Sequence, residues 1–339
     1  MFDVYCVMGQ QVFHDTVHSP QYTTVDMTPK QRWQELLAAF VFLAPSLTGF
    51  LLFTAFPVVA SFILSFFEWD IVTWPPRFVG LDHFIRILGW RLEGGHLVAH
   101  DPLFWKYTWN TVFLMLAIPV NILGSLGLAI LLNRRLKGLV AYRTMMFLPS
   151  ISSAVAIALL WTWLYNPHYG LVNHAIEQTG KLLGLRITGP EWLTDVGWAK
   201  PALMLMGFWT LVGGMNMIYY LASLQGIPKE LYEAAEMDGA SPWQQFMTIT
   251  WPMVSPTTFF VLTMSIIGGF QGGFLNAYIM TRGGPNGATT TIEYYIFNNL
   301  FHYQHAGFAA ALAWVLFLTV FLVTLIHWKR GGKWVFYGI

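Results

Sequence analysis

The chain has 339 residues, of which 55% are hydrophobic and only 10% are charged, and its formal net charge at pH 7 is +1. Soluble domains carry about 25% charged residues, so this composition indicates an integral membrane protein. The near-zero net charge gives no sign of a nucleic-acid partner. Cys6 is the only cysteine, which excludes an internal disulfide and a cysteine-based metal site.

The first 35 residues are mixed and polar. They lack the basic start followed by an apolar core that a cleaved signal peptide needs. We therefore expect 1–35 to be a cytoplasmic tail, and 329–339 to be a second one.

Between these tails the sequence predicts an all-α membrane protein with about six transmembrane helices in a domain over 36–328. Each span requires about 20 apolar residues. The predicted spans lie near 36–67, 108–132, 144–165, 201–224, 253–278 and 307–328. Long polar segments over 68–107, 166–200 and 281–305 separate them, and a shorter one over 228–252 joins the fourth span to the fifth.

Basic residues close to the spans predict the orientation. They cluster in the segment after the second span, in the C-terminal tail and just before the first span, and in a six-span arrangement these three regions fall on one side of the membrane, which the positive-inside rule places in the cytoplasm. The segment 228–252 and both termini fall on that side too, and the three long polar segments face outward. The basic residues are Lys30, Arg32, Arg134, Arg135, Lys137, Arg143, Lys329, Arg330 and Lys333.

The interiors of the predicted spans contain no Asp, Glu, Lys or Arg. This disfavours proton coupling, although sodium coupling through backbone carbonyls stays open. The chain has no G-x-x-x-x-G-K-[ST] phosphate loop and no H-E-x-x-H zinc pattern. We therefore expect no catalytic centre, metal or cofactor on this chain.

Uncharged polar and aromatic residues at membrane depth are the better candidates for contact with a solute, because amides hydrogen-bond to hydroxyl groups and aromatic faces stack on rings. The alternative is that they form structural contacts between helices. Glycine pairs at 268–269 and 272–273 likewise fit either close helix packing or a broken helix along a pathway. The candidates are Trp209, Asn216, Tyr220, Phe270, Gln271 and Asn276.

The segment 229–256 is the most hydrophilic run in the second half of the chain. Helix formers and early acids predict a helix from Pro228 to Asp238, and Gly239 predicts its end and a turn. Ser241 and Pro242 then fit the cap and first position of a second short helix.

This segment resembles the cytoplasmic EAA loop of ABC-importer permeases. The family pattern is Glu-Ala-Ala, three residues, Gly, nine residues and Ile-x-Leu-Pro, and a tryptophan, Trp251, here replaces the leucine. The alternative is an ordinary amphipathic surface helix. The matching positions are Glu233, Ala234, Ala235, Gly239, Ile249 and Pro252, and the resemblance implies that these residues, together with Asp238, couple the chain to an ATPase.

A second resemblance concerns the carbohydrate branch of that family. Tyr278 to Pro285, followed by threonines at 289–291 and an aromatic stretch to Tyr303, is similar to the segment after the fifth span in that branch. Gly307 to Ala311 and Arg143 to Pro149 continue the similarity, which covers roughly residues 107–328.

The resemblance implies a type I ABC importer permease fold and a multi-pass subunit of the bacterial inner membrane. It implies a second permease, as a homologous heterodimer, two ATPases that bind ATP and Mg, an external solute-binding protein and a carbohydrate cargo. Glycerol phosphate is an alternative cargo. A secondary carrier or a membrane-embedded enzyme is a further alternative, and co-purification with an ATPase separates these from the permease.

Overall fold

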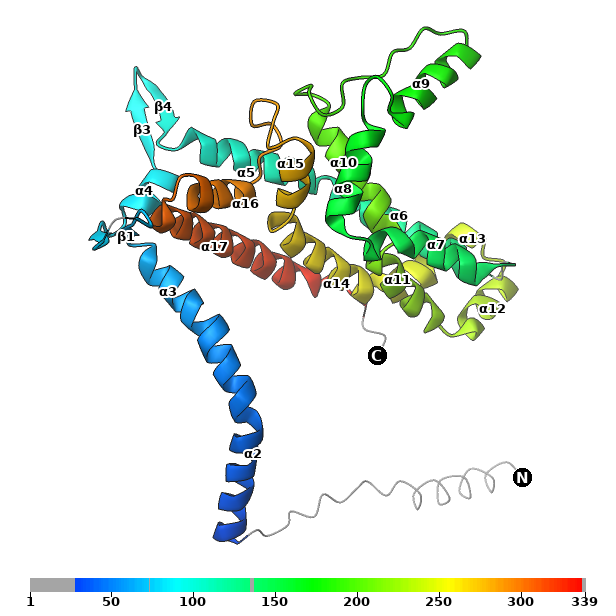
Figure 1. The fold of residues 1–339 in the computed structure, drawn as a ribbon. Helices are drawn as coiled ribbons and strands as arrows, with labels where there is room; N and C mark the ends of the chain where they lie inside the picture. The colour runs from blue at the N-terminus through cyan, green and yellow to red at the C-terminus, as the bar shows by residue number, and fades with distance from the viewer. Residues whose placement is uncertain (1–27, 73, 135–136, 337–339) are drawn as a thin grey trace. The chain divides into compact units, whose positions relative to one another are not determined.

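The computed structural model describes residues 28–72, 74–134 and 137–336, and it divides into two units, Met1–Val59 and Ala60–Ile339. The described chain is mostly helical, with two small two-stranded sheets (Figure 1). Cys6, Arg135 and the first 27 residues of the predicted tail lie outside the described residues.

The described part of the first unit is helical. Thr28 and Gln31 form a capping box at the start of α2 (Pro29–Phe50), so the helix begins within the predicted tail. A wide π-helical turn, η1 (Leu51–Ala55), leads into α3 (Phe56–Leu64). This turn lies just before Pro57, whose ring and missing N–H disturb regular helical bonding. None of the α2 residues is buried, which fits an apolar helix that lies in lipid.

The second unit opens with short elements that lie near one end of it in Figure 1. Strands β1 (Phe67–Glu68) and β2 (Arg77–Phe78) pair antiparallel, and α4 (Asp82–Leu88) follows. Strands β3 (Trp90–Glu93) and β4 (His96–Ala99) form a hairpin whose turn is Gly94–Gly95. Both glycines have positive φ, as the tight turns that match strand twist require.

The helices that follow form the body of the second unit. Asp101 accepts hydrogen bonds from the N–H groups of Leu103 and Phe104 and so caps the first of them. The helices are α5 (Pro102–Met115), α6 (Ala117–Leu132), α7 (Leu139–Ile151), α8 (Ala154–Leu164), α9 (Leu171–Leu182), α10 (Ala199–Val212), α11 (Met215–Gln225), α12 (Lys229–Met237), α13 (Pro242–Gln245), α14 (Trp251–Phe270), α15 (Phe274–Met280), α16 (Ile292–Phe297) and α17 (Ala306–Gly331), with π-helical turns η2 (Phe246–Thr250) and η3 (Asn298–His302).

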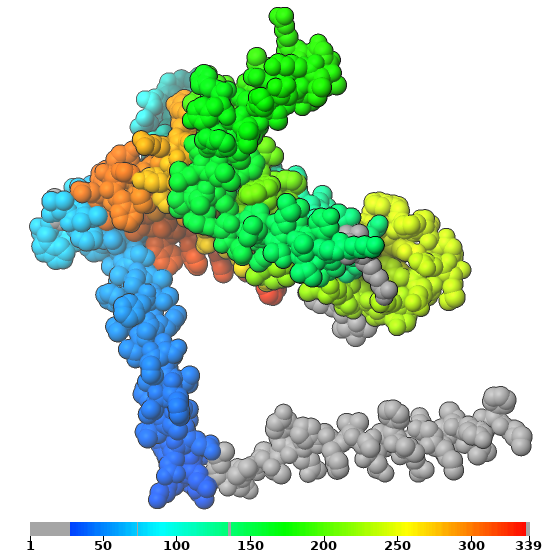
Figure 2. Space-filling view, turned by 45° about the vertical axis from the view of Figure 1, so that its right-hand side comes forward, coloured from blue at the N-terminus to red at the C-terminus, as the bar shows by residue number. Residues whose placement is uncertain are grey.

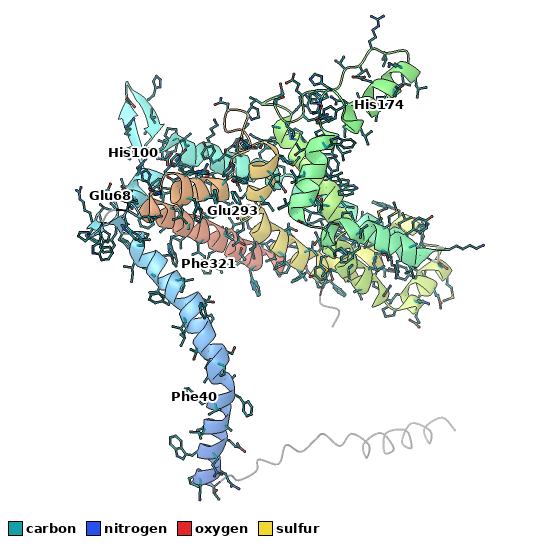
Figure 3. All side chains as sticks on the ribbon, viewed as in Figure 1. Phe40, Glu68, His100, His174, Glu293 and Phe321 are labelled. Atoms are coloured by element: carbon teal, nitrogen blue, oxygen red, sulfur yellow. The ribbon has the colours of Figure 1, made fainter. Side chains whose placement is uncertain are left out.

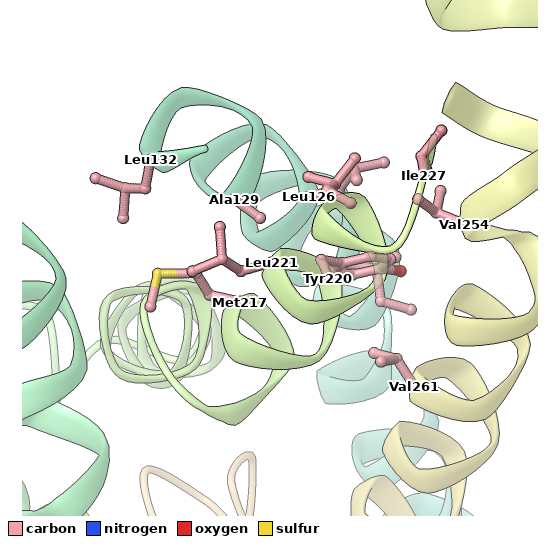
Figure 4. Packing of buried hydrophobic residues seen from close by; sticks show 11 residues of the cluster. Leu126, Ala129, Leu132, Met217, Tyr220, Leu221, Ile227, Val254 and Val261 are labelled. Carbon is pink, nitrogen blue, oxygen red and sulfur yellow. The ribbon is translucent and has the colours of Figure 1, made fainter. Parts of the chain in front are cut away.

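A hydrophobic core joins α6, α11 and α14 (Figure 4). Tyr220 is fully buried there, and its hydroxyl donates to Thr258 Oγ1 at 3.2 Å. Arg143, at the start of α7, donates to the last carbonyl of α6, Leu132 O, at 2.9 Å. The core therefore fixes the helices that lead directly into α12.

Five helical stretches in the described chain are long and apolar enough to cross a membrane, or six if one bent pair forms a span. The bent pair is α7 and α8, which meet at 97°. The sequence predicts one continuous helix over 144–165. Pro149 lies inside α7, and the break follows it at Ser152–Ser153. The fold is thus an all-α membrane protein in which a bent helix pair stands where the sequence predicts the third span.

Candidate functional site

The segment between α11 and α14 forms a helix, a glycine bend and a second helix, which confirms its predicted local structure. Helix α12 ends in a Schellman motif, in which Ala240 N–H donates to Ala235 O at 2.9 Å and Gly239 N–H donates to Glu236 O at 3.0 Å. Gly239 has φ +76°, the left-handed conformation that this motif needs. Ser241 forms a capping box with Gln244 at the start of α13.

The surface of α12 carries unpaired negative charge. Glu230, Glu233, Glu236 and Asp238 are all exposed, and within the described ranges none of these carboxylates forms an ion pair. Met237 is 86% exposed and Trp243, on α13, is 66% exposed. Exposed apolar side chains beside unpaired acids are typical of a surface that docks a basic protein partner.

The same segment is firmly attached to the body of the second unit. Tyr232 and Thr250 share a hydrogen bond of 2.9 Å that ties α12 to η2. Ile249 and Trp251 pack against the core of α6, α11 and α14. Figure 2 shows the α12–α13 region, in yellow-green, protruding at one end of the second unit. A force applied to α12 is therefore transmitted to α11 and α14.

A cavity of about 410 Å³ lies among α5, α6, α10, α11, α14 and α15. Its size falls within the roughly 300–1,000 Å³ of small-molecule sites. Its wall is mostly apolar, with a few amides and hydroxyls as exceptions. The polar and glycine residues of the wall are Thr111, Asn121, Gly207, Asn216, Ser265, Gly268, Gly269, Gly272, Gly273, Asn276 and Thr291.

The glycine pairs contribute to both the packing and the break of this region. A Cβ on Gly269 would lie 2.8 Å from Met115 Cγ, so α14 and α5 pack closely there. Helix α14 ends at Phe270, and Gly273, with φ +87°, precedes α15. The structure thus replaces the single predicted span over 253–278 with a broken helix, and the break lines the cavity.

The sequence-derived candidates for solute contact divide into two groups. Asn216 and Asn276 line the cavity. The other four do not appear in its wall: Trp209 packs edge-on against Trp161, Tyr220 and Phe270 are buried, and Gln271 is exposed at the helix break.

Sequence reasoning missed Asn121. Its side chain lies in the cavity wall and is only 5% exposed, yet its amide oxygen has no hydrogen-bond partner among the described residues. Ser125, one turn further along α6, is fully buried, and its hydroxyl is also unpartnered. A buried amide without a partner is costly unless a ligand or water meets it. The sequence feature that could have identified this site is the pair Asn121 and Ser125, an amide and a hydroxyl four residues apart in an otherwise apolar helix.

The segment 281–291 is held by α5 and ends at the cavity-wall residue Thr291. Asn110 donates to Gly287 O at 2.8 Å and to Thr290 O at 2.9 Å. Thr111 Oγ1 accepts the Ile292 N–H at 3.0 Å. These bonds fix the start of α16 beside the wall residue Thr291.

Glu293, labelled in Figure 3, lies beside the helix break. Burial raises the pKa of its carboxyl, while a hydrogen bond from the Phe274 backbone, at the start of α15, lowers it in part. Within the described residues, no group of three His, Cys, Asp or Glu side chains is arranged to hold a metal ion.

Comparison with known proteins identifies the family. Residues 121–328 match the family described as "Binding-protein-dependent transport system inner membrane component". The chain belongs to this family. It is 35% identical to the probable ABC transporter permease protein YesP of Bacillus subtilis, over 89% of this chain and 92% of that protein. It is 34% identical to the lactose transport system permease protein LacF of Rhizobium radiobacter, over 87% of this chain and 94% of that one.

Two solved structures share the fold of this chain. A chain of a bacterial ABC transporter involved in the import of the acidic polysaccharide alginate superposes with a TM-score of 0.73 at 23% identity, covering 89% of this permease and 98% of that chain. A second structure, of the bacterial alginate transporter in complex with an alginate pentasaccharide-bound periplasmic protein, gives a TM-score of 0.71 at 24% identity, covering 87% and 93%.

Proposed function

We propose that this chain is one permease subunit of an ATP-driven importer that moves a sugar or oligosaccharide across the bacterial cytoplasmic membrane. The observation that carries the proposal is the exposed helix-bend-helix at 229–252, rigidly joined to helices that line a solute-sized cavity. The sugar cargo is supported by relatives named as transport permeases for lactose and for arabinooligosaccharides.

The helix α12 is the part of this chain that meets the ATPase. Its exposed acids, Glu233 among them, would face basic residues in a groove of that subunit, and the small side chains of Ala234 and Ala235 allow close approach. ATP and Mg belong to that partner. When two ATPases close on each other, α12 would move as a rigid body and carry α11 and α14 with it, switching the cavity between inward-open and outward-open packings.

The cavity forms half of the translocation pathway. Amide groups of Asn121, Asn216 and Asn276 offer donors and acceptors for sugar hydroxyls in an otherwise apolar wall. A second, homologous permease would supply the other half, and an external binding protein would deliver the sugar to the face opposite α12. With α12 in the cytoplasm, both termini lie there as well.

Reconstitution of the full chain with its partner subunits in proteoliposomes tests this function. We expect ATP hydrolysis that rises when the sugar-loaded binding protein is added, together with uptake of sugar that requires ATP. An assembly that takes up sugar in response to an ion gradient without ATP would overturn the proposal.

A further inference from the structure

Lys200 is the second residue of α10 and continues the face of that helix that lines the cavity. Leu203, Met204, Gly207 and Leu211 form this face, and Lys200 precedes them at helical spacing. Lys200 therefore lies above the cavity at the end of α10 that is distant from α12 along the chain. A charged residue at the end of an apolar span usually marks an aqueous pathway or reaches for a polar interface.

The ammonium group of Lys200 reaches across to α5. Its Nζ lies 4.9 Å from the centre of the Phe113 ring on α5, the helix that also contributes Thr111, Leu114 and Met115 to the wall. An ammonium over an aromatic face is held by the ring quadrupole but keeps its full charge. The contact thus fixes a positive charge between α10 and α5.

Lys106 adds a second positive charge to the same region. It lies on α5, and its ammonium donates to the backbone carbonyl of Asn286 at 2.6 Å. Lys106 precedes Phe113 by about two turns of α5, so the two side chains leave the same face of that helix and Lys106 follows the ring that Lys200 covers. In the parts of the chain that the structure describes, neither ammonium group has a carboxylate partner.

Two like charges placed near each other without a counter-ion repel, and an arriving anion relieves that repulsion. From this arrangement we infer that the cargo is an anionic carbohydrate, whose acidic group is received by Lys200 and Lys106 at the mouth of the cavity. The hydroxyls of the sugar then meet the amides of the cavity wall. This inference rests on the proposed function and adds the chemical class of the cargo.

The test uses the reconstituted complex with its binding protein and a panel of disaccharides in matched neutral and acidic forms, galactobiose against digalacturonate and cellobiose against its diglucuronate counterpart. The readout is the maximal rate of ATP-dependent uptake at saturating binding protein. We expect uptake of acidic members in preference to their neutral counterparts. Lys200→Gln should lower the rate for the acidic sugar about tenfold, because it removes a charged hydrogen-bond donor to the acidic group.

Two variants serve as controls. Lys200→Arg keeps the charge and should retain most acidic-sugar uptake. Lys181→Gln removes a lysine from α9 and should leave the rate unchanged. If Lys200→Gln fails to assemble, Lys106→Gln replaces it, because that side chain is exposed and bonds only to a backbone carbonyl.

The possible results separate the two proposals. Acidic-sugar uptake that is equal in wild type and Lys200→Gln, or a wild-type preference for the neutral members, would overturn the anionic cargo and leave the sugar permease intact. Equal loss of neutral and acidic uptake would indicate that Lys200 contacts lipid headgroups or the binding protein, and would also overturn it. Absence of uptake for every sugar in the panel would overturn both proposals.

Discussion

Gly239 offers a direct test of the bend in the coupling segment. The residue has φ +76°, and a Cβ built on it would meet nothing within 4 Å. A side chain at this position therefore causes no collision, and its cost arises from the backbone conformation alone. That cost is about 1–2 kcal/mol for an ordinary L residue in the left-handed region, which lowers the population of the bend relative to alternatives roughly 5–30-fold.

The size of the effect should depend on the type of residue. Asparagine tolerates a left-handed backbone, so Gly239→Asn should destabilise the bend least. Gly239→Ala should destabilise the bend by the amount given above, about 1–2 kcal/mol. Gly239→Val should destabilise it more, because a β-branched residue at positive φ is strongly disfavoured. The assay is ATP hydrolysis stimulated by the loaded binding protein in the reconstituted complex, with thermal unfolding of each variant measured in parallel.

Gly127 supplies a matched control. It lies on the exposed side of α6 and also has open space around it, but its backbone is not left-handed. Gly127→Ala and Gly127→Val should leave stimulated ATP hydrolysis close to wild type. Wild-type coupling in Gly239→Val, or a loss that follows side-chain size equally at both glycines, would refute the conformational reasoning.

Three further predictions concern the charge, the cavity and the helix break. Glu233→Lys reverses an exposed, unpaired charge on α12 and should reduce stimulated ATP hydrolysis at least tenfold without preventing membrane insertion; normal stimulation would count against docking through this acid. Gly268→Leu projects a side chain from the cavity wall into open space and should block uptake while the protein still folds, whereas Gly127→Leu should transport normally; equal transport by both would remove the cavity from the pathway. Because burial raises the pKa of Glu293 above its ordinary 4.5, its stabilising contribution is present below that pH and is lost as pH rises through the raised value. The melting temperature of wild type should therefore fall relative to that of Glu293→Gln as the pH rises above 4.5, and a constant difference in melting temperature would contradict the burial of this carboxyl.

The coupling segment could be predicted from sequence because its signals are local. A serine cap followed by proline, and a glycine after a run of helix formers, determine their structure within a few residues. The acids of α12 remain exposed because none of the described residues covers that face. The role of these residues in docking stays a prediction.

The positions of the helix breaks could not be predicted from hydropathy, because a continuous and a broken apolar helix have the same hydropathy. The run over 144–165 is continuously apolar, yet α7 and α8 meet at 97°. The glycine pairs of the fifth span were ambiguous, and tertiary packing resolves them: Gly269 meets Met115, while Gly268 faces open space.

Only some of the polar residues in the cavity wall could be predicted from the sequence. Asn216 and Asn276 lie in the wall, whereas Tyr220 forms a structural hydrogen bond to Thr258 in the core. Sequence alone does not distinguish these environments, because each is a single polar residue in an apolar helix. Asn121 was overlooked for the same reason, and only the unpartnered state of its amide oxygen separates it from a structural contact.

The central claim is that α12 touches an ATP-hydrolysing subunit inside the cell. Since Cys6 is the only cysteine, a Cys6→Ser background allows single cysteines to be placed at Glu233 and, as a control on α9, at the 87%-exposed Leu182. Cross-linking in intact cells then measures contact of each cysteine with the ATPase. A membrane-impermeant thiol reagent measures whether each cysteine is accessible from outside the cell. The account predicts that Glu233→Cys cross-links to the ATPase and resists the reagent, while Leu182→Cys reacts with it and does not cross-link. Labelling of Glu233→Cys from outside, or its failure to cross-link to any ATPase, would contradict the account.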